Sequence, residues 1–336
     1  MGFKRLDAED FVVSADAVQS VAWSTNSPTL TEFYTSPVQA AGSSGNYYLS
    51  VFQTSSTDDT AAVQFDIAYG NVNGSGSTPF NSNLPKYTPA STTYGQYRSL
   101  ILEDENAQFT FGDGTNTLIS DDFWVLSVER ARYKESLFPG TFNLNLSSSA
   151  GLIQLTDNSN DVLTQTFLGS NRVLQIVSGS NGSAYDTTGY VAGSGSYGLF
   201  LPDIGTILLN PAAISQSIEV DTTKTSGLAN GTNQETLFTA IKSGSAFTLN
   251  AQETITSDYV FVRSRNAEFN YSTNPSFITG STGEVIYTEF INSPQVYVTT
   301  VGMYNDANEL VAVAKLSKPL LKDFTKESLI RVKLDF

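Results

Sequence analysis

The end of the chain alternates apolar and polar side chains residue by residue. Within residues 328–336, the apolar residues Ile330, Val332, Leu334 and Phe336 alternate with the charged residues Arg331, Lys333 and Asp335. A period of two predicts a strand with one buried face. Just upstream, residues 295–304 and 309–316 predict two further strands, joined by the turn residues 305–308. We therefore expect the chain to end inside a sheet.

Short apolar runs separated by turn residues recur along the rest of the chain. They predict strands over residues 46–53, 61–69, 97–103, 107–111, 123–132, 141–146, 152–155, 161–168, 172–177, 199–209, 247–249, 259–263 and 268–271. Many short strands at regular spacing favour an all-β class, built mainly of antiparallel sandwich- or barrel-like units.

Only a few segments favour helix. Residues 8–18 place Phe11, Val12, Ala15 and Val18 on one helical face, and residues 211–216 and 234–242 are further short candidates. Residues 70–93 and 179–198 are rich in Gly, Ser or Asn, which predicts long surface loops.

The length of 336 residues favours more than one packed unit, because single cores stop growing at roughly 250–300 residues. We expect an N-terminal arm over residues 1–45, a β-rich domain over 46–200 and a second β-rich domain over 201–336. The second domain would end in the closing hairpin and the terminal strand.

Composition excludes several kinds of chemistry. The chain has no Cys and no His, which removes disulfides, thiolate metal sites and the usual general base. The net charge of −15 argues against binding nucleic acid through its phosphates. No apolar run reaches membrane-spanning length and no signal peptide is evident, so we expect a soluble chain made in a cytoplasm.

Carboxylates remain as candidate chemistry. Residues 103–105 and 121–122 are acidic clusters that could supply the two carboxylates of glycoside hydrolysis, but neighbouring carboxylates at strand ends are more often solvated turn residues. The run at 157–161 resembles the start of a calcium loop, yet Val162 and Leu168 stand where that loop needs Gly and Glu. We expect no catalytic residue, no cofactor and no metal ion. The charged run at 128–135 fits either an interface or a sheet edge guarded by charge.

Several segments resemble virion structural proteins of T4-like contractile-tailed phages that infect marine cyanobacteria, and the resemblance runs nearly end to end. It is carried by FKRLD at 3–7, DFVVS at 10–14, ARYKESLFPGTFNL at 131–144, GSYGLFLPD at 195–203, TTVGMYND at 299–306 and KLSKPL at 315–320. The closing hairpin also resembles modules of tail and baseplate proteins that carry fibres.

This resemblance implies a non-enzymatic structural subunit of the virion, in the baseplate wedge, its periphery or the fibre-attachment region. A neck, connector or capsid-surface component and a glycan-binding tail protein remain alternatives. The expected partners are other tail or baseplate proteins and copies of the chain itself, with no nucleic acid and no membrane. The expected location is the virion, assembled in the bacterial host's cytoplasm.

Two segments are candidate partner contacts. Residues 315–336 hold six basic and three acidic side chains, a net +3, whereas the preceding 314 residues carry −18. A basic end can dock on an acidic neighbour, although a solvated strand face or loop is the better explanation for any single Lys. The predicted contact residues are Phe3, Phe11, Val13 and Trp23 in the arm and Lys315, Lys318, Lys322, Arg331, Lys333 and Phe336 at the end of the chain.

Overall fold

The structure is a computed structural model that describes residues 4–36, 48–73, 90–113, 116–149, 151–186, 189–215, 218–220, 232–272 and 274–335. It is mostly β, with 47% strand and 15% helix, so the predicted all-β class is confirmed. The chain forms two compact units. The terminal unit combines Met1–Ala17 with Thr254–Phe336, and the central unit is Val18–Glu253.

The residue boundaries of these units differ from those of the predicted domains. The predicted boundary between residues 200 and 201 falls inside strand β15, Gly198–Leu201. That strand pairs with β16, Thr206–Leu209, through four residue pairs of one antiparallel ladder. Residues on both sides of the predicted boundary therefore belong to one sheet, and both ends of the chain contribute to the terminal unit.

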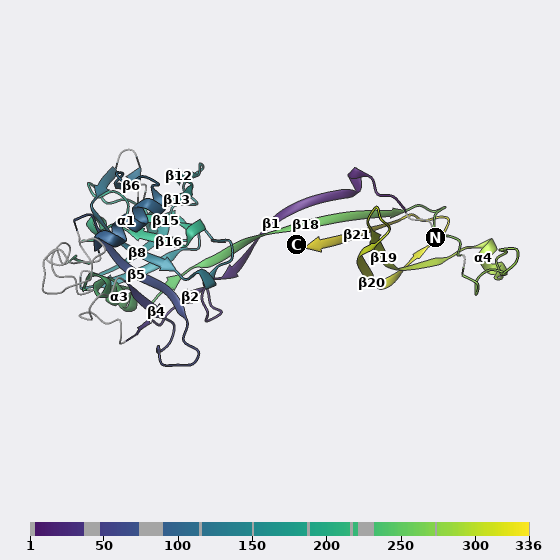
Figure 1. The fold of residues 1–336 in the computed structure, drawn as a ribbon, viewed down its shortest axis with the longest axis horizontal. Coiled ribbons are helices and arrows are strands. Elements are labelled where there is room, and N and C mark those ends of the chain that lie inside the picture. The colour runs from purple at the N-terminus through teal and green to yellow at the C-terminus, as the bar shows by residue number, and fades with distance from the viewer. Residues whose placement is uncertain are drawn as a thin grey trace. The chain divides into compact units, whose positions relative to one another are not determined.

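The central unit is built around one large antiparallel sheet (Figure 1). In spatial order its main strands are β2 (Thr29–Leu30), β17 (Phe247–Thr248), β10 (Asn143–Ser148), β11 (Gly151–Asp157), β13 (Asn171–Ser180), β15, β16, β8 (Asp122–Val128), β5 (Val63–Asn71), β4 (Leu49–Phe52) and β3 (Tyr34–Thr35). Short strands β12 (Thr166–Leu168) and β14 (Ser183–Ala184) pair with β13, and β6 (Phe109–Asp113) pairs with β7 (Asn116–Ser120).

The two outermost strands of this sheet are consecutive in the chain. β2 ends at Leu30 and β3 begins at Tyr34, so only residues 31–33 join the opposite edges. So few residues span little more than about 10–15 Å even when extended. The sheet must therefore curl until its edges approach each other, which gives the barrel-like form that the strand pattern predicts.

The curled sheet is buried on both faces. In β8, Trp124, Leu126 and Val128 join the larger core, whereas Phe123 and Val125 join a second core on the opposite face. The period of two along the strand explains this division. Phe247 is central to the larger core, with ring centroids 4.9 Å from Trp23, 5.4 Å from Phe65 and 5.8 Å from Phe142.

Short helices cover the sheet. They are α1 (Ala90–Ile101), α2 (Pro211–Ile214) and α3 (Thr232–Gly244), with 3-10 turns at Arg130–Arg132 and Pro202–Ile204. α1 packs on β5, and Tyr94 stacks on Phe123 at 5.2 Å between ring centroids. The predicted helix at 234–242 is confirmed within α3, and the one predicted at 211–216 is confirmed over the residues of α2, while Gln216 lies outside the described residues. The predicted strand at 97–103 is wrong, because these residues form the end of α1 and bury Ile101.

The predicted loop over residues 70–93 also needs correction at its ends. β5 continues to Asn71, and α1 begins at Ala90. The predicted loop otherwise falls largely on residues 74–89, which lie outside the described residues.

The terminal unit contains a sheet in the order β1 (Phe11–Val21), β18 (Asn250–Ser264) and β21 (Ser328–Asp335), and a separate hairpin of β19 (Val296–Tyr304) and β20 (Leu310–Lys322). The limits of the two units fall inside β1 and β18. In the central unit, the start of β18 pairs with β9 (Ser136–Leu137). The terminal unit also holds a short helix, α4 (Thr288–Asn292).

The closing hairpin and the alternating terminal strand are confirmed. β18 and β21 pair antiparallel with Val260 opposite Val332, and the inward face of β21 is the predicted one. The predicted helix over residues 8–18 is wrong: only Ala8–Asp10 form a 3-10 turn, and β1 follows because its backbone pairs with β18. The predicted strand at 268–271 is also wrong, because the chain turns after β18.

Candidate assembly surface

The terminal unit buries very little apolar surface of its own. Among its described residues, Val260, Pro294 and Val332 are the only fully buried apolar side chains. The central unit, by contrast, holds both large hydrophobic cores. A unit that fully buries so few apolar side chains and leaves many large ones exposed is typical of a surface that another chain covers.

Many large apolar side chains of the terminal unit lie exposed. They are Phe11, Val12, Val13, Phe269, Tyr271, Ile286, Tyr287, Ile291, Tyr297, Tyr304, Leu310, Val311, Val313, Phe324 and Leu329. Single exposed residues of this kind need no explanation, but their number in one small unit favours a surface that a partner covers. Nine of them lie on strands β1, β19, β20 and β21, which Figure 1 labels.

The hairpin of β19 and β20 is apolar on both faces. Val311 is 68% exposed and Val313 57% exposed on one face, while Val301 and Ala314 are a half-buried pair on the other. The two strands pair with each other and with no further strand of the described chain. Because an isolated two-stranded hairpin is marginally stable in water, this one is expected to gain stability from a partner.

The sheet of β1, β18 and β21 has two open edges. β1 and β21 each pair with β18 on one side, and no other backbone hydrogen bond of the described residues reaches their outer edges. β1 contains no Lys and no Pro, the residues that commonly guard an edge against pairing. Such an edge is a template for the strand of another chain.

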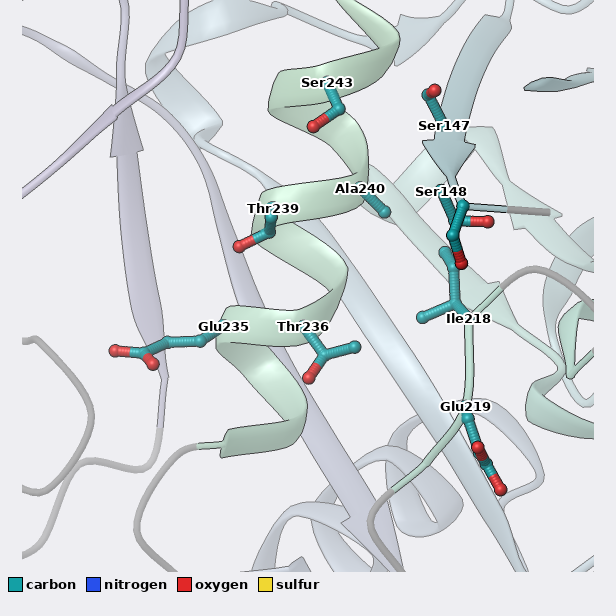
Figure 2. Close-up of a pocket in the computed structure, with 10 residues that line it drawn as sticks. Ser147, Ser148, Ile218, Glu219, Glu235, Thr236, Thr239, Ala240 and Ser243 are labelled. Atoms are coloured by element: carbon teal, nitrogen blue, oxygen red, sulfur yellow. The ribbon is translucent and has the colours of Figure 1, made fainter. Parts of the chain in front are cut away.

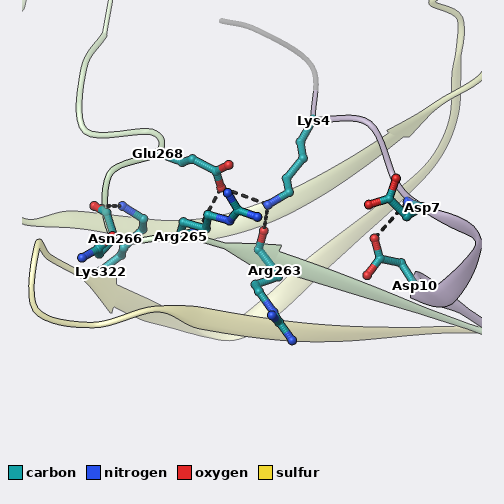
Figure 3. A network of polar contacts seen from close by, with 8 residues as sticks. All are labelled: Lys4, Asp7, Asp10, Arg263, Arg265, Asn266, Glu268 and Lys322. Atoms are coloured by element: carbon teal, nitrogen blue, oxygen red, sulfur yellow. Dashed lines mark hydrogen bonds and ion pairs between the residues drawn. The ribbon is translucent and has the colours of Figure 1, made fainter.

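A polar network ties the N-terminal segment to the turn after β18 (Figure 3). The Lys4 ammonium lies 3.0 Å from a Glu268 carboxylate oxygen and donates to the Arg263 carbonyl. The same Glu268 oxygen accepts from the Arg265 backbone N–H at 2.9 Å. The pKa of Glu268 is lowered, first by that backbone hydrogen bond and then by Lys4. This network positions the segment that leads into β1.

The prediction that Lys322 contacts a partner is wrong. Its side chain is fully buried, and its ammonium donates to the Asn266 carbonyl at 3.1 Å and to Asn270 Oδ1 at 2.8 Å. Burial lowers the pKa of Lys322. The side chain therefore closes the turn after β18 and leaves no charge for a neighbour.

Trp23 is also wrong as a partner contact. It is 2% exposed, its ring packs on Phe247, and its indole N–H donates to the Phe247 carbonyl at 2.9 Å. A Trp whose ring is packed and whose indole N–H is hydrogen-bonded inside the central unit is a core residue.

The other predicted contacts lie on the surface where they are described. Phe11 and Val13 are 49% and 68% exposed on β1. The remaining basic residues are exposed on β20 and β21: Lys315, Lys318, Arg331 and Lys333. Phe3 and Phe336 lie outside the described residues. Val311 and Val313 were not among the predicted contacts. The run of consecutive apolar residues 310–314 could have indicated them, because it places apolar side chains on both faces of β20.

The charged run at 128–135 is engaged within the chain. Arg130 donates to the carbonyls of Tyr133 and Lys134, and the Lys134 ammonium lies 2.8 Å from Glu253. Arg130 and Lys134 are thus engaged within the chain, and the two roles predicted for the run, an interface and a sheet edge guarded by charge, stay predictions.

The acidic clusters show turn and core contacts. Glu103 accepts from the Ser170 N–H at 2.9 Å, and hydrogen bonds from Ser170 lower its pKa. Asp122 accepts from the Tyr69 hydroxyl at 2.7 Å, and burial raises its pKa. Asp157 is buried and accepts from the Gly140 N–H at 2.8 Å, where it stabilises the predicted turn.

The central unit has an open hollow of about 710 Å³ beside α3 (Figure 2). Hydroxyl groups dominate its lining, with Glu219 and Glu235 as its carboxylates. In Figure 2 Glu235 extends from α3 away from Glu219. Glycoside cleavage needs two carboxylates that face one bond, whereas these two side chains point away from each other.

Within the described part of the chain, no group of three or more acidic side chains is placed to hold a metal ion. No described helix is long and apolar enough to cross a membrane.

Comparison with known proteins finds no relative of the chain. No protein-family model, no curated protein and no solved structure matches the chain. The candidate assembly surface therefore stands on the chain's own geometry.

Proposed function

We propose that this chain is a non-enzymatic structural subunit that assembles through its terminal unit. The observation that carries this proposal is the imbalance in that unit, which fully buries Val260 and Val332 yet exposes apolar side chains on β1, β19, β20 and β21. Apolar side chains that the unit does not cover itself stabilise a complex when a neighbour covers them.

We further propose that the assembly is the virion of a contractile-tailed phage, in the baseplate periphery or the fibre-attachment region. This part rests on the resemblance of the sequence to T4-like cyanophage virion proteins, quoted above on its residues. The geometry supports the kind of role, a subunit working by protein–protein contact, and the resemblance supplies the particle.

Incorporation into particles tests both parts. Val311→Asp together with Val313→Asp places charge on the exposed face of the hairpin, and Leu163→Asp is the control because Leu163 is fully exposed in the central unit. We expect the wild-type chain and the control in purified virions and the hairpin variant to be missing, with unchanged circular dichroism of the free chains.

Two results contradict the proposal. Absence of the wild-type chain from purified virions contradicts the virion role. Equal incorporation of all three chains contradicts the hairpin as the contact surface.

A further inference from the structure

We propose that copies of this chain join edge to edge, with β1 of one copy pairing along β21 of the next. This inference deepens the proposed function and rests on it. It names the partner of the terminal unit as a second copy of the chain and names the two strands that meet.

The first support is the backbone. β1 and β21 are the two outer strands of one sheet, and each leaves an edge without a backbone partner among the described residues. Every buried N–H and C=O needs a hydrogen-bond partner, so strand pairing is the contact that suits such edges. Joining β1 to β21 of a neighbour satisfies both edges with one kind of contact.

The second support is charge. Residues 7–21 hold four acidic side chains, Asp7, Glu9, Asp10 and Asp16, and no basic one. β21 carries Arg331 and Lys333 against Asp335, a net +1, and Lys333 is ion-paired with Asp335 at 2.9 Å. Arg331 has no ion pair among the described residues. An acidic edge beside a basic edge is favourable.

The same charges disfavour the symmetric alternatives. Two β1 edges would bring acidic segments together, and two β21 edges would bring basic ones together, and like charges across a ladder are destabilising. The favoured contact is therefore head to tail. Contacts of this type close into a ring or continue as a filament.

The charge of the whole chain points to the same unit. The central unit holds 8 basic and 20 acidic residues, a net −12, whereas the terminal unit holds 10 and 13, a net −3. Copies that met through central units would bring large like charges together. The terminal unit offers contact at much lower electrostatic cost.

Disulfide trapping tests the pairing without background, because the chain has no Cys. Chains carrying one Cys in β1 (Val12→Cys, Val13→Cys, Ala15→Cys or Ala17→Cys) are mixed with chains carrying one in β21 (Leu329→Cys or Ile330→Cys) and oxidised mildly. Paired strands place Cα atoms at about 4.5–5.5 Å, within disulfide reach. The set of positions samples both faces and several registers.

Controls separate pairing from collision. Leu163→Cys mixed with Leu329→Cys reports random encounter, since Leu163 is exposed in the central unit. We expect at least one β1–β21 mixture to cross-link far faster than this control and than either chain alone. We also expect Arg331→Glu with Lys333→Glu to slow the cross-linking, and Asp16→Lys in the other chain to restore it.

Three results overturn the inference. They are cross-links formed only between like strands, cross-linking no faster than the Leu163 control, and a full chain that sediments as a monomer at every concentration tested. A chain that is monomeric yet enters virions overturns self-pairing and leaves the assembly role intact. A chain that self-pairs yet is absent from virions overturns the virion role alone.

Discussion

The same substitution, Val to Thr, should have opposite consequences in the two units. Val51 is fully buried in β4, whereas Val311 and Val313 are 68% and 57% exposed on β20. Thr keeps the β-branched shape that strands favour and replaces one methyl group by a hydroxyl. The change therefore reports on burial with little effect on strand propensity.

The expected magnitudes follow from burial. At Val51 the hydroxyl enters an apolar core without a partner, which costs about 1–3 kcal/mol. Losing one buried methyl adds about 0.8 kcal/mol. We therefore expect Val51→Thr to lower the free energy of unfolding by about 2–4 kcal/mol. At Val313 the free chain should change by no more than about 0.5 kcal/mol.

In the assembly, Val→Thr is expected to be costly on β20, where it changes little in the free chain. Val311→Thr together with Val313→Thr removes two methyl groups from the proposed contact, worth about 1.6 kcal/mol at about 0.8 kcal/mol each. A loss of this size weakens association by roughly tenfold.

Two assays separate the units. The two Trp residues of the chain, Trp23 and Trp124, are both buried in the central unit, so Trp fluorescence in urea follows that unit alone. Hydrogen exchange of β19 and β20 follows the terminal unit. If Val313→Thr speeds exchange across the hairpin of the free chain as strongly as Val51→Thr destabilises the central unit, the valines pack within the chain and the reasoning fails.

Three further predictions concern named groups. Lys322→Met should destabilise the turn at 266–270 by about 1–3 kcal/mol, because it leaves two acceptor oxygens without a hydrogen bond. Lys318→Met on the exposed part of β20 should not, and hydrogen exchange of the turn measures the difference. Burial raises the pKa of Asp122, so the folded state binds its proton more tightly. The free energy of unfolding should then fall as pH rises from the unfolded pKa through the folded one, and Asp122→Asn should remove that fall in a urea series. Gly244→Ala would place a Cβ 2.0 Å from a backbone oxygen of β10 and should cost about 1–3 kcal/mol in thermal unfolding, whereas Gly95→Ala, with open space around it, should be neutral or stabilising.

Local pattern predicted much of the fold. The alternation at the end of the chain gave β21 with its correct inward face, because a period of two needs only neighbouring residues. The same pattern misled at residues 8–18, where apolar spacing fits a helical face as well as a strand. There the pairing of β1 with β18, more than two hundred residues away, decides the outcome.

The surface was harder to predict than the class of fold. A Lys in a basic segment has no local signal that it will be buried, and Lys322 is buried only because the turn at 266–270 brings two oxygens to it. Likewise Trp23 joins a core whose other rings come from distant strands. Which segments make up the terminal unit could not be predicted from local sequence either, because the unit joins the two ends of the chain.

Cryo-electron microscopy of purified particles tests the central claim most directly. The account predicts density for this chain in the particle, with β1, β21 and the β19–β20 hairpin covered by neighbouring subunits and the sheet of the terminal unit continued by another copy. Density in which the central unit makes the contacts and these strands face solvent would contradict it, as would particles that lack the chain.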